Sequence, residues 1–158
     1  MSDALYHDRM LELAAASDRS EALARPDAEV TLDNPLCGDR VTLALSADAT
    51  GAITGLSHQV RGCVLCRAAT AVLAAHAVGH DAAGLERVRT ALQQRLRAGA
   101  QGTTADTEES AADAWPALTV FAPVAPHKSR HECVLLPFDA ALEALAACPR
   151  PHPCHRCP

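Results

Sequence analysis

Three short segments of the chain carry side chains that could bind a soft metal. Cys37 and Asp39 stand in a run of turn-forming residues, Cys63 directly follows a glycine, and Cys133 precedes an apolar stretch. Three thiolates and one carboxylate form a tetrahedral donor set for a divalent metal such as zinc. Thiolates also suit iron and sulfide. Since a carboxylate binds soft iron–sulfur clusters less tightly than a thiolate, this set could release its cargo or open for incoming sulfur.

The cysteine count itself needs an explanation. The chain has seven cysteines among 158 residues. Its first residues lack a basic segment followed by an apolar one, and the sequence has no run of 18 apolar residues, so we expect a cytoplasmic protein without a membrane span. Disulfides are disfavoured in that compartment and the count is odd, which favours metal ligation or thiol chemistry. The alternative for any one cysteine is a small buried hydrophobe.

The bulk composition is typical of one globular domain. Hydrophobic residues make up 49% of the chain and aromatic residues only 3%, so the predicted core is built from leucine, valine and alanine. The net charge is −5, which argues against a nucleic-acid partner because such partners favour a basic face.

The first half of the sequence predicts a small sheet. Apolar residues recur at helical spacing over 3–16 and alternate with polar residues over 28–33 and 40–47. The residues from Asn34 to Asp39 read as a turn, and a third strand is expected from Ile53 to Val60. Because the connections are short, the three strands are predicted to form an antiparallel meander.

The second half predicts helices. We expect a buried helix over 64–78, a second helix capped by Asp81 and ending near Arg97, and a last helix over 130–147 that Pro137 should kink or whose start it should move. The arginines of the second helix suit a surface facing solvent. Residues 99–114 are expected to be a mobile loop, and 115–124 form a short apolar segment.

These elements would gather the candidate ligands. The meander brings the turn after the first strand and the end of the third strand to one edge, where Cys37 and Cys63 can meet. Cys133 can join them if the last helix packs back on the sheet. Gly38 would let the turn bend so that Cys37 and Asp39 face inward together.

The three segments resemble signatures of the NifU N-terminal/IscU/SufU family of iron–sulfur cluster assembly proteins. Asn34–Arg40 (NPLCGDR) is similar to the NP-x-CGD motif, Arg61–Cys66 (RGCVLC) to the second, glycine-preceded cysteine, and Arg130–Leu136 (RHECVLL) to the third-cysteine segment. The similarity extends over about residues 5–146. It implies an α+β fold, with a three-stranded antiparallel sheet and helices packed on one face, formed by a domain of residues 1–147. It also implies ligation by Cys37, Asp39, Cys63 and Cys133.

The sequence is most similar to the SufU type. The gap between Cys63 and Cys133 is long, and Glu132 stands where IscU-type proteins have histidine. No segment matches the LPPVK motif through which IscU-type proteins bind a chaperone. The resemblance implies zinc, or iron in a [2Fe–2S] cluster, as the bound group. It implies a SufS-like cysteine desulfurase and apo iron–sulfur proteins as partners.

Three functions remain open from the sequence. The protein could be a scaffold on which a cluster assembles, or a zinc-dependent sulfurtransferase that accepts sulfur from the desulfurase. It could also be a degenerate member that only binds metal. For the sulfurtransferase we predict Cys133 as the persulfide acceptor, because its helix is tethered by 99–114 and interrupted by Pro137.

Further residues near the motifs have alternative interpretations. Cys66 shares a helix face with Cys63 and could be a spare ligand, a resolving thiol or a buried filler. Arg130 could keep a nearby thiol deprotonated, whereas His131 is expected to be solvated and Arg61 to lie on the surface. The tail 148–158 contains four prolines, which favour disorder. Its metal-like residues are Cys148, His152, Cys154, His155 and Cys157.

Overall fold

The computed structural model of the chain describes residues 8–15, 23–98 and 115–148. The elements in order are α2 (Asp8–Ala15), β1 (Ala28–Asn34), β2 (Asp39–Ala47), β3 (Ile53–Arg61), α3 (Val64–His76), α4 (Ala82–Ala98), the 3-10 helices η3 (Pro116–Val124) and η4 (Lys128–Arg130), and α6 (His131–Ala147). The predicted strands and last helix agree with these bounds to within one residue. The expected loop 99–114 and the tail beyond Cys148 lie outside the described residues, as does the start of the first predicted helix.

The sheet is the antiparallel meander that the sequence predicts. Its strand order is β1-β2-β3, and the register pairs Val30 with Leu43 and Val41 with Val60. The apolar residues of each strand point to one face, because side chains alternate along a strand. The opposite face is polar, and Thr31 and Thr42 share a hydrogen bond of 2.9 Å there.

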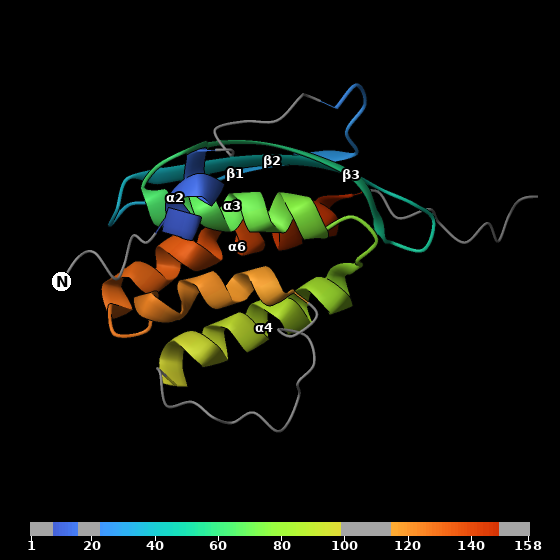
Figure 1. Cartoon of the computed structure of the whole chain (residues 1–158). Helices are drawn as coiled ribbons and strands as arrows, with labels where there is room; N and C mark the ends of the chain where they lie inside the picture. The colour runs from blue at the N-terminus through green and yellow to red at the C-terminus, as the bar shows by residue number, and fades with distance from the viewer. Residues whose placement is uncertain (1–7, 16–22, 99–114, 149–158) are drawn as a thin grey trace, which may run out of the picture.

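The helices lie on the apolar face of the sheet, which confirms the predicted α+β class (Figure 1). α3 and α6 pack next to the strands, and α4 and η3 form a further layer (Figure 1). The buried side of α3 includes Ala68, Ala69, Val72 and Leu73. Small side chains let the helix approach its neighbours closely. Within the described residues, no helix is both long and apolar enough to cross a membrane.

Two side-chain contacts hold α4 in place, one at its start and one along its length. The Asp81 carboxylate accepts a hydrogen bond of 2.8 Å from the Gly84 amide, which confirms the predicted N-cap. Arg89, which we expected to face solvent, is instead half-buried and forms an ion pair with Asp139 of α6. The difference arises because α4 packs against α6, which the spacing of arginines alone does not reveal.

α6 carries Cys133 in its first turn and continues past Pro137, which is buried. Pro137 has no amide hydrogen, so the carbonyl of Cys133 lacks the helical hydrogen bond it would normally accept four residues on. The helix start stays at His131, although we expected that Pro137 could move it. The turn that carries Cys133 is therefore tied to the rest of α6 by one hydrogen bond fewer.

Candidate metal centre

The turn between β1 and β2 is organised by Asn34. The Asn34 carbonyl accepts hydrogen bonds from the amides of Cys37 (3.2 Å) and Gly38 (2.7 Å). Its side-chain Oδ1 accepts another, of 3.0 Å, from the amide of Leu36. Gly38 has a φ of 76°, a left-handed conformation that glycine adopts without strain. These contacts fix the direction in which Cys37 leaves the turn.

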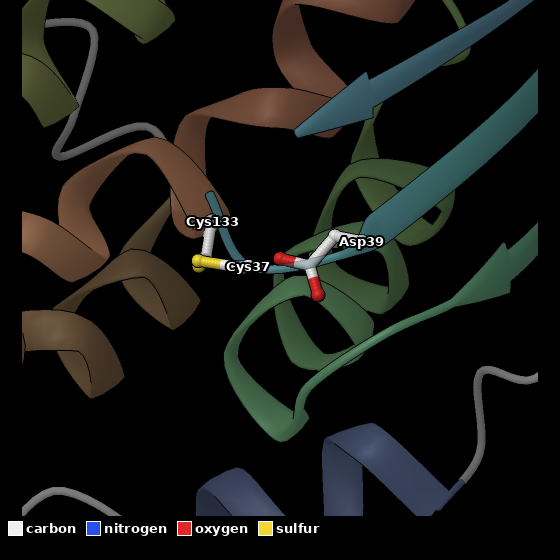
Figure 2. Close-up of side chains that lie close together, drawn as sticks. All are labelled: Cys37, Asp39 and Cys133. Carbon is white, nitrogen blue, oxygen red and sulfur yellow. The ribbon is translucent and has the colours of Figure 1, made fainter. Parts of the chain in front are cut away.

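Cys133 meets Cys37 across the turn. Their two Sγ atoms are 3.0 Å apart, although 96 residues separate them in sequence. Ligand atoms of Cys37, Asp39 and Cys133 all lie within 4.8 Å of one another. Figure 2 shows the two sulfur atoms together, with one carboxylate oxygen of Asp39 directed toward them. The structure thus brings together three of the four predicted ligands.

Two polar side chains approach these sulfurs. The Asn34 amide group donates to Cys133 Sγ over 4.0 Å, and an Arg130 guanidinium nitrogen lies 3.9 Å from Cys37 Sγ. Asn34 is only 6% exposed. Asn34 therefore connects the turn to the Cys133 sulfur in α6. Arg130 has its guanidinium group beside a thiol, the position in which a cation favours a thiolate.

Cys63, the fourth predicted ligand, joins the group through Asp39. The buried Asp39 carboxylate accepts a 2.8 Å hydrogen bond from the Cys63 amide, and the Cys63 thiol lies 3.7 Å from its other oxygen. Gly62 makes this approach feasible. A Cβ atom on Gly62 would lie 2.8 Å from Asp39 Cγ and closer still to Oδ1, inside van der Waals contact.

The thiols of Cys63 and Cys133 shift each other's pKa in opposite directions. The Cys133 thiol donates to the Cys63 sulfur, which lowers the pKa of Cys63 to about 7; the amides of the first turn of α3 add to this. The same contact, together with burial, raises the pKa of Cys133. Without metal, Cys63 is therefore the first of the two to become a thiolate.

The donor set fits a tetrahedral divalent metal. With zinc–sulfur bonds of about 2.3 Å, tetrahedral geometry places two sulfurs about 3.8 Å apart. The Cys37 and Cys133 sulfurs are 3.0 Å apart, so a small rotation of the side chains would make room for the ion. The same donors suit iron and sulfide. A bound cation would also compensate the buried Asp39 carboxylate.

The other candidate residues of the motifs and the tail differ in burial and in their contacts. Cys66 is fully buried and burial raises the pKa of its thiol, which agrees with the interpretation as a filler. His131, expected to be solvated, is half-buried and donates a 3.0 Å hydrogen bond to the Ala125 carbonyl. Arg61 is exposed, as expected. Cys148 is half-buried, while the remaining metal-like tail residues, His152, Cys154, His155 and Cys157, lie outside the described residues.

Two contributors to the site are not evident from the sequence alone. Asn34 is predicted only to form a turn, but its side chain also reaches Cys133. Gly62 has no predicted role in the site, but its missing side chain is what admits Asp39. The signals were an asparagine before proline, which often bonds its own backbone two residues on, and a glycine directly before a candidate ligand.

Comparison with known proteins identifies the family. The profile of the NifU-like N-terminal domain matches residues 5–134, so the chain belongs to the NifU-like N-terminal domain family. It is similar to the crystal structure of a NifU-like protein (N-terminal) from Brucella abortus, with 32% identity, a TM-score of 0.77 and coverage of 92% of this chain and 94% of that one.

A second solved structure shares the fold at lower identity. It is a protein of Fervidobacterium islandicum AW-1 assigned as an iron–sulfur cluster assembly scaffold for the SUF system. The identity is 19% and the TM-score 0.75, and the alignment covers 92% of this chain and 99% of that one. A search of curated protein sequences finds no match.

Proposed function

We propose that this protein serves iron–sulfur cluster assembly by receiving sulfur from a cysteine desulfurase at a metal held by Cys37, Asp39, Cys63 and Cys133. The observation that carries the proposal is the convergence of thiols and a buried carboxylate from three distant segments at one edge of the sheet. Membership of the NifU-like N-terminal domain family supports it. When bound, zinc would keep the thiols as thiolates and protect them from oxidation.

Accessibility decides which thiol meets the sulfur donor first. Cys133, the acceptor predicted from the sequence, is fully buried, whereas Cys37 is half-buried and lies in a surface turn. Cys133 could react only after the first turn of α6 opens. We therefore propose that Cys37 accepts the sulfur, with Cys133 remaining as a ligand.

Transfer of sulfur from the desulfurase persulfide to Cys37 needs no added oxidant. The Cys37 thiolate attacks the terminal sulfur of the desulfurase persulfide. A new sulfur–sulfur bond forms on Cys37, the old one breaks, and the desulfurase cysteine leaves as a thiolate. Arg130, 3.9 Å from Cys37 Sγ, can stabilise the negative charge on the reacting sulfur.

A scaffold role is the second candidate, and Asp39 favours it. An oxygen donor among sulfur ligands gives a [2Fe–2S] cluster a labile corner from which it could pass to an apo iron–sulfur protein. A cytoplasmic location, the absence of a nucleic-acid partner and the client proteins remain predictions.

Desulfurase kinetics and peptide mass spectrometry test the sulfurtransferase proposal. Adding the protein to a cysteine desulfurase from the same cell should raise the rate of alanine release from cysteine and leave one extra sulfur, about 32 Da, on the peptide containing Cys37. Cys37→Ser should abolish both effects, and Cys66→Ser should retain them. A persulfide on Cys133 instead would restore the sequence-based assignment. No stimulation, together with iron-dependent cluster formation on the protein alone, would leave only the scaffold role.

A further inference from the structure

Next to the candidate metal centre, one large apolar side chain is presented to solvent. Leu36 is 83% exposed, more than any other large hydrophobic residue that the structure describes; Val78 follows at 55% and Leu11 at 44%. Exposure of a single leucine is common and needs no explanation by itself. Leu36, however, directly precedes Cys37 in the turn that forms the site.

The exposed position of Leu36 is fixed by the structure around it. The Leu36 amide donates to the Asn34 side chain, and the next two amides donate to the Asn34 carbonyl. Asn34 is itself buried against Cys133. A side chain held in this way loses little backbone entropy when a partner covers it, which favours binding.

Basic residues surround the same edge of an acidic protein. Five cations and two carboxylates flank the site along the chain, although the net charge of the whole chain is −5. The carboxylates are Asp33, which is paired with Arg40, and Glu132. We call the five cations the basic rim: Arg40, Arg61, Arg67, Lys128 and Arg130.

The register and the helices place the backbone of each basic-rim residue close to a candidate ligand. Arg40 follows Asp39 and pairs across the sheet with Arg61. Arg67 lies one helical turn after Cys63, and its amide donates to the Cys63 carbonyl. Arg130 contacts Cys37, and Lys128 precedes it in η4.

From this combination we infer that Leu36 is the apolar anchor by which the sulfur donor docks, entering a hydrophobic pocket that acidic residues surround on the desulfurase. The inference rests on the proposed function. Burial of an exposed leucine strengthens binding, and complementary charge raises the rate of encounter. Docking at Leu36 would also place the incoming persulfide, itself an anion, one residue from the Cys37 thiol.

The test measures how much protein is needed to half-saturate the stimulation of alanine release by the cysteine desulfurase. Leu36→Ala should raise that concentration about tenfold, corresponding to about 1.4 kcal/mol, and leave the maximal rate and metal content unchanged. Leu36→Met, which keeps an apolar side chain of similar volume, should restore most of the affinity. Val78→Ala is the matched control, because Val78 lies beyond the far end of α3, about 20 Å from Cys63 along the helix.

Charge reversal tests the rim separately. Arg61→Glu should raise the half-saturating concentration several-fold at low salt and less at high salt, while Arg87→Glu, at an exposed arginine on α4, should not. An unchanged half-saturating concentration for Leu36→Ala with a stimulating wild type overturns the anchor and leaves the proposed function intact. A wild type that neither binds nor stimulates any desulfurase of its cell overturns both. Self-association of the wild type that Leu36→Ala abolishes, with unaltered stimulation, assigns Leu36 to a dimer contact and also overturns the inference.

Discussion

Substitution of Gly62 tests how the carboxylate of the site is held. In Gly62→Ala the new Cβ would lie 2.8 Å from Asp39 Cγ and 3.0 Å from its Cβ, distances that a folded protein does not tolerate. The Asp39 side chain must therefore move, and it is fully buried and bonded to the Cys63 amide. The backbone of Gly62 itself is not left-handed, so alanine causes no backbone strain and the loss of stability comes from this contact.

Two effects contribute to the expected loss of stability in Gly62→Ala. Overpacking a buried site costs about 1–3 kcal/mol, and loss of a hydrogen bond to a charged group costs about 1.5–3 kcal/mol. Since relaxation relieves part of both, we expect Gly62→Ala to lower the free energy of unfolding of the metal-free protein by about 2–4 kcal/mol. Affinity for zinc, as distinct from the lifetime of a cluster, should fall as well, because the ion would lose its carboxylate donor.

Urea unfolding and metal titration measure these effects. Gly84→Ala is the control, since its Cβ would meet nothing closer than 3.3 Å, the distance to the Asp81 carboxylate oxygen that caps α4. In the Asp39→Ala background, Gly62→Ala should cost at least 1 kcal/mol less than in the wild type, because the two nearest atoms it would strike, Cγ and Oδ1 of Asp39, are gone. A Gly62→Ala protein with wild-type stability and wild-type metal affinity would refute this account of how Asp39 is placed.

Three further predictions concern individual ligands and their neighbours. Asp39→Ala should make a reconstituted cluster persist longer in air and transfer more slowly, measured by its visible absorbance; faster loss would show that the carboxylate is a firm ligand. In metal-free protein, alkylation of Cys63 should rise with a midpoint near pH 7, because the thiolate is the nucleophile and forms as the pH rises through the lowered pKa of about 7; a midpoint above pH 8.5 would contradict the contact with Cys133. Asn34→Ala removes both the acceptor for the Leu36 amide and the donor to Cys133, so it should destabilise the fold by about 1 kcal/mol or more in urea unfolding and lower metal affinity in a titration; wild-type stability and metal affinity in Asn34→Ala would exclude a role for this side chain.

Local patterns were sufficient to predict the elements of the fold. Alternation along β1 and β2, the turn residues between them and the Asp81 cap each act over a few residues, so the sequence displays them directly. The antiparallel pairing followed because only four residues, 35–38, connect β1 and β2. The ion pair of Arg89 with Asp139 could not be predicted in this way, since it depends on how two helices pack.

The site was predictable in its residue types but not in its geometry. Family motifs predicted the candidate ligands, and the predicted meander placed Cys37 and Cys63 at one edge. The burial of Cys133 depends on how α6 crosses the sheet, and it changes which thiol is accessible to a sulfur donor. The close approach of Gly62 to Asp39 likewise depends on the β2–β3 register and on the side-chain conformation of Asp39, which no sequence pattern specifies.

Metal analysis of the purified protein tests the central claim most directly. The account predicts close to one zinc per chain, or iron and sulfide when the protein is isolated without oxygen. It also predicts loss of that metal in Cys37→Ser, Cys63→Ser and Cys133→Ser, with full retention in Cys66→Ser. A wild-type protein that carries no metal under either condition and takes up none on titration, with all of its thiols free, would contradict it.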